Sequence, residues 1–217
     1  LAHAAAVADA DQLEQLWSRF RRDSDISRLN WAEGQPVEVH QHTIRLVHAM
    51  MDSARITDGD FDPTLLPALL DAGYTRSTRD PRLVTTLPSS AVAPSDLAAT
   101  VIENSTVRLA KGTTLDAGGI GKGLAADIIC EFLQHEGAWG AMAEVSGDLR
   151  VLGTAPDGEA WILGIEHPSA PDTDLTRVRL SDGALVTSSV LKRRWMTDTG
   201  ERHHLIDPTS GDSANVR

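Results

Sequence analysis

The stretch Thr114-Leu-Asp-Ala-Gly-Gly-Ile-Gly-Lys-Gly-Leu-Ala-Ala-Asp127 places a glycine-rich turn and a lysine at the start of a helical pattern. Glycines allow positive φ and a close approach of the backbone to a ligand, and the first turn of a helix offers about four unpaired N–H groups to an anion. Lys122 adds a positive charge among these donors. The pattern predicts a strand that closes at Asp116, a phosphate-binding turn, and a helix that ends near Gly137. A purely structural strand-to-helix connection is the alternative.

Two familiar phosphate motifs do not match this segment. A Walker A loop requires glycine five residues before the glycine that precedes the lysine, and Ser or Thr after it, but these places hold Asp116 and Gly123. The dinucleotide fingerprint requires a third glycine where Leu124 stands. The sequence therefore argues against a P-loop or Rossmann nucleotide site.

Composition and charge limit the classes of function. The 217 residues are 41% hydrophobic and 24% charged, with a formal net charge of -11, as in an ordinary acidic globular protein. Binding to nucleic acid is not expected, because the dense basic cluster Arg19-Phe-Arg-Arg22 is interpreted as the solvated C-terminus of a helix. No apolar stretch is long enough to span a bilayer, and no signal peptide is recognised at the N-terminus. We expect a cytoplasmic protein, or an exported or lipid-anchored one if a leader has been removed. Cys130 is expected to be a small buried hydrophobe.

Two helices are expected in the first third of the chain. The first covers residues from about 7 to 22, with an apolar face made of Leu13, Leu16, Trp17 and Phe20. The second runs from about Thr43 to the Asp58-Gly59 pair, with an apolar face made of Ile44, Val47, Met51 and Ala54. The next segment, Asp60-Phe-Asp-Pro-Thr64, is too rich in turn residues for regular structure, and residues 78–95 are expected to form a surface loop.

Short apolar runs dominate from residue 99 onward and predict β-strands. Turn signals at Lys111-Gly112, Ser146-Gly-Asp148 and Asp182-Gly183 predict antiparallel hairpins between them. We therefore expect an α+β fold of mixed, mostly antiparallel sheets with flanking helices, in a single domain over residues 1–217. The predicted strands are Thr100–Ile102, Thr106–Leu109, Met142–Val145, Leu149–Leu152, Trp161–Ile165, Val178–Leu180 and Leu185–Thr187.

Reactive residue types gather near the end of the chain. His203 and His204 are neighbours in a predicted strand, so only one of them can face a given cleft. Asp207 either takes part in chemistry or accepts N–H bonds in the turn from Pro208 to Gly211. Ser189 and Lys192 match the spacing of serine acyl-enzymes, but the other motifs of those enzymes are missing or out of order, so acyl transfer is a remote alternative.

A resemblance to a known family is carried, in chain order, by Ser18-Arg-Phe-Arg-Arg-Asp-Ser-Asp-Ile-Ser-Arg-Leu-Asn30, Gly59-Asp-Phe-Asp-Pro-Thr64, Asp116–Asp127, Val145-Ser-Gly-Asp148, Thr187-Ser-Ser189 and His204-Leu-Ile-Asp-Pro-Thr-Ser-Gly211. Together these segments resemble the ApbE family of FAD:protein FMN transferases, once called thiamine-biosynthesis lipoproteins. The resemblance implies a magnesium-dependent enzyme with an FAD cleft between two halves of one compact unit. Such an enzyme splits the pyrophosphate of FAD, transfers FMN to a Ser or Thr hydroxyl of an acceptor flavoprotein, and releases AMP.

The resemblance also assigns site residues, position by position. A magnesium contact falls on the backbone carbonyl of Gly119, and His204 matches the histidine of the family's terminal motif, as a base for the acceptor hydroxyl. The expected FAD contacts are Phe20, Asp60, Phe61, Asp62, Asp116, Lys122 and Ile206.

Departures from the family's pattern bear on these expectations. Ser146 and Ser189 stand where the family has glycine, so each added Cβ is expected to narrow the cleft or to adjust a turn. The family's magnesium carboxylate and hydroxyl belong to a segment that follows the last turn of this sequence, and a Met-Gly-Thr strand that contacts the flavin precedes its start. We therefore expect an incomplete metal site within residues 1–217. A non-catalytic FAD-binding module and an FAD pyrophosphatase remain as alternatives.

Overall fold

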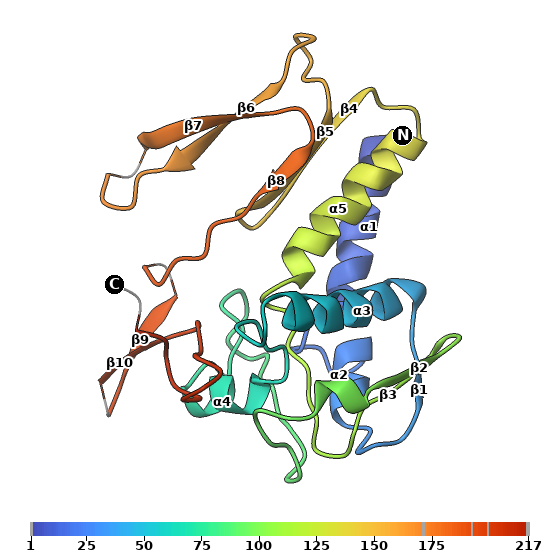
Figure 1. Ribbon diagram of the computed structural model, residues 1–217, viewed down its shortest axis with the longest axis vertical. Helices are drawn as coiled ribbons and strands as arrows, with labels where there is room; N and C mark the ends of the chain where they lie inside the picture. The colour runs from blue at the N-terminus through green and yellow to red at the C-terminus, as the bar shows by residue number, and fades with distance from the viewer. Residues whose placement is uncertain (1, 171, 192, 199, 216–217) are drawn as a thin grey trace. The chain divides into compact units, whose positions relative to one another are not determined.

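The computed structural model of the protein describes residues 2–170, 172–191, 193–198 and 200–215 (Figure 1). They fall into two compact units, which are described separately. The first unit comprises residues 1–11 and 122–191, and the second comprises residues 12–121 and 192–217. The boundaries lie inside helix α1 (Ala2–Trp17) and after the first residue of helix α5 (Gly121–His135). The single domain over residues 1–217, with a cleft between two halves, stays a prediction.

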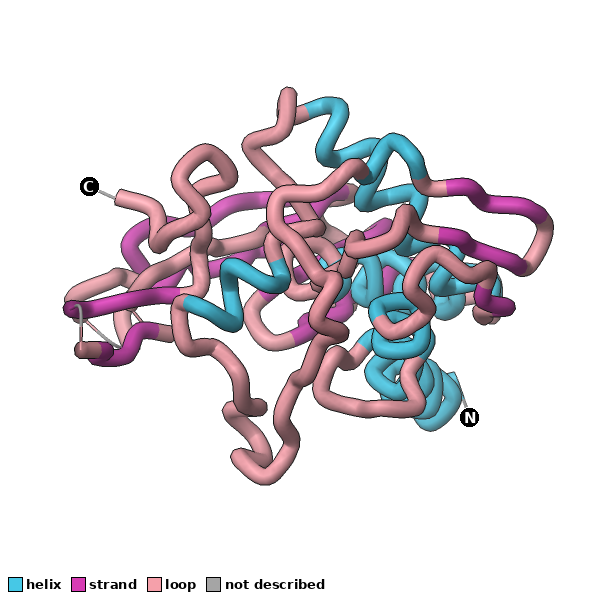
Figure 2. Tube along the Cα trace, turned by 90° about the horizontal axis from the view of Figure 1, so that it is seen from below, coloured by secondary structure: helices cyan, strands magenta, loops and turns pink. Residues whose placement is uncertain are grey.

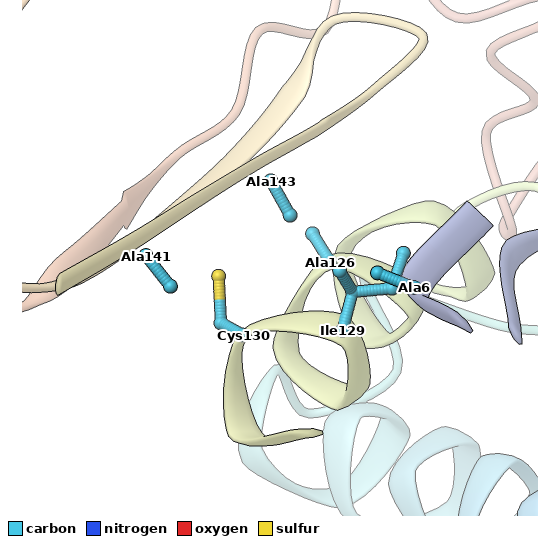
Figure 3. Packing of buried hydrophobic residues seen from close by; sticks show 6 residues of the cluster. All are labelled: Ala6, Ala126, Ile129, Cys130, Ala141 and Ala143. Atoms are coloured by element: carbon cyan, nitrogen blue, oxygen red, sulfur yellow. The ribbon is translucent and has the colours of Figure 1, made fainter. Parts of the chain in front are cut away.

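The first unit is built on helix α5 and the hairpin of strands β4 (Gly140–Val145) and β5 (Asp148–Gly153). Mostly small side chains from α5, β4 and α1 pack together in its core (Figure 3). Cys130 is fully buried in this cluster, and burial raises the pKa of its thiol, as expected for an inert structural cysteine. The buried members of the core are Ala6, Ala126, Ile129, Cys130, Ala141 and Ala143.

The other strands of this unit correct one prediction. Strand β6 (Trp161–Glu166) pairs with β7 (Asp174–Leu180), whereas β8 (Gly183–Leu185) pairs with β5. The Asp182-Gly183 turn therefore leads from one sheet into another and does not close a hairpin. Arg150 on β5 explains the change of sheet, because its guanidinium lies 2.6 Å from Oδ1 of Asp182 and donates to the carbonyl of Gly183 at 2.8 Å.

In the second unit, α1 ends at Trp17, five residues before the predicted end. The chain then turns through residues 18–23, and Ser24 caps helix α2 (Asp25–Asn30) by accepting the N–H of Ser27 with its hydroxyl oxygen. The predicted apolar face is partly confirmed. Leu13 and Trp17 are buried, while Leu16 and Phe20 are half-buried.

Helix α3 (Gln41–Ile56) forms where it was predicted, but its buried face is rotated. Of the predicted apolar face, Val47 alone is buried, whereas Ile44, Met51 and Ala54 are half-buried. The side chains that are buried are Thr43, Leu46, Val47 and Met50. A buried carboxylate explains the rotation, because Oδ2 of Asp25 accepts the hydroxyl of Thr43 at 2.8 Å and holds that face inward.

The rest of the second unit consists of short elements joined by long loops, as Figure 2 illustrates. Residues 60–64 contain no helix or strand, and residues 78–95 form a loop that makes only an isolated bridge, from Val84 to Arg76. Both predictions of irregular structure are confirmed. The short elements are strands β1 (Val37–Glu38), β2 (Val101–Glu103) and β3 (Thr106–Arg108) in the order β1-β3-β2, helices α4 (Leu66–Asp71) and η1 (Leu97–Ala99), and the pair β9 (Arg194–Thr197) and β10 (Gly200–His203).

No helix among the residues that the model describes combines the length and the apolar character needed to cross a membrane.

Candidate functional site

The glycine-rich turn before α5 is shaped by close packing and not by unusual backbone angles. None of the glycines at 118, 119, 121 and 123, all of which are described, has positive φ, so that part of the sequence argument is wrong. A Cβ on Gly119 would lie 2.7 Å from Cε2 of Phe61, and one on Gly118 would lie 2.8 Å from Oδ2 of Asp116. Glycine is required here because a ring and a carboxylate pack directly against the backbone.

Lys122 lies in the first turn of α5, as predicted, and it has a partner that the sequence did not reveal. Its Nζ donates to Oδ1 of Asp148 at 2.9 Å, and the Asp148 side chain is only 6% exposed. Asp148 begins β5, directly after the tight turn at Ser146-Gly147. The ion pair fixes the position of the ammonium group, whose remaining N–H donors can still bind an anion beside the N-terminus of α5.

The backbone at Asp116 is fixed by hydrogen bonds of the preceding residue, Leu115, and of its own N–H group. The predicted strand at residues 113–115 is absent, because the Asn30 side chain occupies the hydrogen-bonding groups that a neighbouring strand would use. The Asn30 side-chain amide donates to the carbonyl of Leu115 at 2.9 Å, and the Asn30 side-chain oxygen accepts the N–H of Leu115 at 2.7 Å. The N–H of Asp116 donates to the carbonyl of Pro63 at 2.9 Å. This bond brings the turn at residues 60–64 next to the glycine segment. The hairpin predicted at Lys111-Gly112 is therefore also wrong.

Arg19 contradicts the interpretation of the basic cluster as solvated. Its side chain is 5% exposed, and its Nε lies 3.3 Å from Oδ1 of Asp116. Burial lowers the pKa of the Arg19 guanidinium, while the charge of Asp116 and the nearby Tyr74 oppose that shift. Arg21 and Arg22 are exposed, as expected. The cluster thus contributes one buried cation to the candidate site.

Phe20 belongs to a row of aromatic rings. Its ring meets that of Tyr74 edge to face at a centroid distance of 6.1 Å, and Tyr74 lies 5.7 Å from the ring of Trp195 on β9. The Trp195 indole donates to the carbonyl of Ala72 at 2.7 Å, which fixes this end of the row. A groove of about 850 Å³ opens beside Phe20 and Trp31, within the size range of cofactor sites. Phe20 is the one predicted FAD contact that lines this groove in the described structure, and Tyr74 and Trp195 do not line it.

The Asp60-Phe61-Asp62 segment forms a turn with distinct roles for its residues. Asp60 is exposed, whereas Phe61 is half-buried and packs against Gly119. Oδ1 of Asp62 accepts the N–H of Thr64 at 2.7 Å, so one carboxylate oxygen stabilises the turn. Phe61 therefore presents a ring beside the glycine segment, whereas Asp60 is exposed.

His203 and His204 have different surroundings at the end of β10. Nε2 of His203 contacts the carbonyl of Ala214 at 2.9 Å, and its Nδ1 accepts the N–H of Leu205, so this histidine holds the terminal loop. Nδ1 of His204 lies 3.4 Å from the carbonyl of Arg193. If Nδ1 carries the proton of that contact, the lone pair lies on Nε2, as a base requires.

The turn after these histidines is structural, as the sequence analysis allowed. Asp207 accepts the N–H of Thr209 at 2.8 Å, and that bond lowers the pKa of its carboxyl group. Ile206 forms an isolated bridge with Ser213. Ser189 accepts the N–H of Leu191, whereas Lys192, the other residue of the acyl-enzyme spacing, lies outside the described residues.

The structure thus connects part of the predicted set. In the second unit, Phe20 and Asp116 are joined by Arg19, and Phe61 and Gly119 are in contact. Lys122 belongs to the first unit, together with Asp148. Sequence reasoning missed the roles of Arg19, Asn30 and Asp148. All three fall within segments that carry the family resemblance, which was the signal available.

Gly119, the predicted magnesium contact, is exposed and has few possible co-ligands nearby. No three Asp, Glu, His or Cys side chains gather into a metal-binding group in the described part of the chain. Asp116, three residues before Gly119, already pairs with Arg19 through Oδ1. Magnesium is usually held by one or two carboxylates together with waters and phosphates. A magnesium ion at the Gly119 carbonyl would therefore rely on waters and on the phosphates of a bound ligand for its other contacts.

A comparison with known proteins places the chain in a family. The model of the ApbE family matches residues 2–217. The chain belongs to the ApbE family. It is 28% identical to the FAD:protein FMN transferase of Vibrio cholerae serotype O1, over 95% of this chain and 63% of that protein. It is 30% identical to the FAD:protein FMN transferase of Treponema pallidum, over 94% of this chain and 61% of that protein. The chain therefore spans slightly less than two thirds of the length of these ApbE relatives.

Solved ApbE structures confirm the fold. The ApbE protein of Thermotoga maritima matches with a TM-score of 0.81 and 26% identity, over 98% of this chain and 70% of that one. The flavinyl transferase ApbE of Pseudomonas stutzeri, in its apo form, matches with a TM-score of 0.76 and 28% identity, over 98% of this chain and 67% of that one. The predicted family and the predicted α+β class are both confirmed.

Proposed function

We propose that the protein is an FAD:protein FMN transferase, which moves FMN from FAD to a Ser or Thr hydroxyl of an acceptor flavoprotein and releases AMP. The observation that carries the proposal is the ammonium group of Lys122, held by Asp148 at the N-terminus of α5 in an ApbE chain. A helix N-terminus with a fixed cation suits a pyrophosphate better than any neutral part of FAD. Relatives with this name support the same substrate.

The other predicted residues keep the roles that the family resemblance implies. Phe20, in the aromatic row beside the groove, and Phe61, packed on the glycine segment, offer ring faces to the isoalloxazine system. Asp60, Asp62 and Asp116 offer oxygen acceptors to the polar groups of FAD, and Ile206 offers an apolar contact. Lys122 and the first turn of α5 bind the pyrophosphate.

The transfer exchanges one phosphate bond for another. The acceptor hydroxyl oxygen attacks the phosphorus that carries the riboflavin, a new P–O bond forms, and the bond to the AMP oxygen breaks. The hydroxyl proton leaves to a base, and the leaving AMP takes the electron pair of the broken bond. Nε2 of His204 is the base in this proposal, supported by the contact of Nδ1 with the Arg193 carbonyl.

Magnesium is part of the proposal through the general chemistry of pyrophosphate, whose charge a divalent cation offsets. The carbonyl of Gly119 is the contact that this chain contributes. No step of the transfer is assigned to the metal.

Two alternative outcomes have distinct products. A pyrophosphatase uses water in place of the acceptor hydroxyl and yields free FMN and AMP. A binding module leaves FAD intact. We expect mass spectrometry of a candidate acceptor, mixed with the protein, FAD and magnesium, to show an acceptor that carries FMN. An acceptor whose target Ser or Thr is replaced by Ala is the matched control. Unmodified acceptor with free FMN and AMP, or with intact FAD, would contradict the proposal.

A further inference from the structure

Arg19 is a buried cation whose contacts come from separate parts of the second unit. Besides Asp116, its Nη1 donates to the hydroxyl of Thr85 at 2.7 Å and its Nη2 donates to the carbonyl of Tyr74 at 2.9 Å. The backbone carbonyl of Arg19 accepts the Thr85 hydroxyl at 3.2 Å. The planar guanidinium group presents its donors in a rigid fork, so these contacts fix its plane as well as its position.

The same guanidinium lies against two aromatic rings. Its Cζ is 4.2 Å from the centroid of the Phe20 ring and 4.7 Å from that of the Tyr74 ring, both within the range of cation–π contacts. These two rings also meet each other edge to face. The position of the Phe20 ring therefore depends on the orientation of Arg19.

Arg19 also determines which oxygen of Asp116 is engaged. Its Nε lies 3.3 Å from Oδ1, while Oδ2 lies beside Gly118, 2.8 Å from the place where a Cβ would stand. The carboxylate therefore turns Oδ2 toward the glycine segment that precedes Lys122. Without the guanidinium, the Asp116 carboxylate would lose the contact that fixes this rotation.

We propose that Arg19 is a positioning residue for flavin binding: it sets the Phe20 ring and the Oδ2 atom of Asp116 in the arrangement in which they contact FAD. This inference rests on the proposed function, because it takes Phe20 and Asp116 as FAD contacts. A purely structural role is the alternative. Removing one partner of a buried ion pair is usually destabilising, so the stability of each variant is measured beside its FAD affinity and the two readouts are compared.

The test compares Arg19→Met and Arg19→Lys with Arg21→Met, in which an exposed arginine paired only with Asp23 in the described structure is replaced. FAD affinity is measured by calorimetry and by quenching of flavin fluorescence, and folding by thermal unfolding. We expect Arg19→Met to bind FAD about tenfold more weakly, the scale of one charge-assisted hydrogen bond. Lysine restores the positive charge but not the planar fork of donors, so the FAD affinity of Arg19→Lys should lie between that of Arg19→Met and that of the parent. Arg21→Met should bind FAD like the parent.

A double-mutant cycle separates positioning from packing. If Arg19 acts through Asp116, Arg19→Met should weaken FAD binding less in an Asp116→Asn protein than in the parent. If Arg19→Met does not fold, Arg19→Lys takes its place in the cycle. The inference would be overturned if the folded Arg19 variants bound FAD as tightly as the parent. It would also be overturned if Arg19→Met lowered FAD affinity by the same factor in the parent and in the Asp116→Asn protein. A parent protein that binds no FAD would overturn the proposed function itself, and the inference with it.

Discussion

The Nζ atom of Lys122 lies 2.9 Å from Oδ1 of Asp148, the buried first residue of strand β5. This contact joins the start of α5 to the tight turn of the β4–β5 hairpin, two of the segments that together carry the resemblance to the ApbE family. Asp148 offsets part of the lysine charge, but it also holds the ammonium group at the N-terminus of the helix. The pair thus fixes the position of the lysine charge, which is the basis for the pyrophosphate site proposed here.

Replacing Lys122 by alanine should weaken FAD binding more than riboflavin binding, because only FAD presents a pyrophosphate. The expected loss for FAD is about 1.5 to 3 kcal/mol, the scale of hydrogen bonds to charged groups. Calorimetric titration of both ligands measures the difference. Lys111→Ala, in which an exposed lysine outside the site is replaced, is the matched control. Equal weakening of FAD binding and riboflavin binding would contradict the assignment of the pyrophosphate to this site.

Two glycines of the same segment should respond oppositely to alanine. In Gly119→Ala the new Cβ would lie 2.7 Å from Cε2 of Phe61, so the ring must move, at a cost of about 1 to 3 kcal/mol in stability. In Gly123→Ala nothing lies within 4 Å, and alanine favours a helix over glycine by up to about 1 kcal/mol. Urea unfolding of the two variants provides the comparison. A stable Gly119→Ala protein would show that Phe61 does not pack on the glycine turn.

The turn at Ser146 should tolerate glycine better than the native serine. Ser146 has φ of +53° and Gly147 has φ of +94°, as in a type I′ hairpin turn, and the family's glycine at this position fits that geometry. Ser146→Gly should therefore stabilise the protein by about 0.5 to 1 kcal/mol, because relief of about 1 to 2 kcal/mol of left-handed strain is partly offset by the greater chain entropy that glycine loses on folding. Gly147→Ala, where a Cβ meets nothing within 4 Å, should destabilise it through backbone strain alone. Thermal unfolding of both variants checks the pair, and a destabilised Ser146→Gly protein would show that the serine side chain itself is needed.

Substitutions of the two neighbouring histidines should have different effects, one on the transfer reaction and the other on stability. His204→Ala should lower the rate of FMN transfer by about 100-fold to 10,000-fold, the usual contribution of a general base, and leave FAD affinity nearly unchanged. His203→Ala should instead lower the melting temperature, because His203 holds the loop near Ala214. Rates of FMN transfer and thermal unfolding distinguish the two. Loss of transfer in a stable His203→Ala protein would reverse the assignment.

Local patterns predicted most of the elements, and failed where a side chain replaced a backbone partner. The turn at residues 60–64, helix α3 and the β4–β5 hairpin depend on nearby residues, so their sequence signals were sufficient. The strand predicted at residues 113–115 is absent because Asn30, 85 positions from Leu115, occupies its hydrogen-bonding groups. No periodicity within a short window contains that information.

The site was predictable in its residue types but not in its connections. The glycine segment and Lys122 carry a local signal for an anion site, and it points to the N-terminus of α5. The role of Arg19 was missed because a cluster of three arginines within four residues is usually solvated. Its burial depends on Asp116, Thr85 and Tyr74, which lie far away in the sequence and satisfy the guanidinium together.

The central claim is that the protein transfers FMN from FAD to a protein hydroxyl, and the ratio of the two products tests it most directly. AMP released and flavin bound covalently to the acceptor are quantified in the same reaction with FAD and magnesium. The account predicts one AMP for each FMN found on the acceptor, and no bound flavin on an acceptor that lacks the target hydroxyl. Release of AMP without protein-bound flavin would contradict it and identify water as the nucleophile.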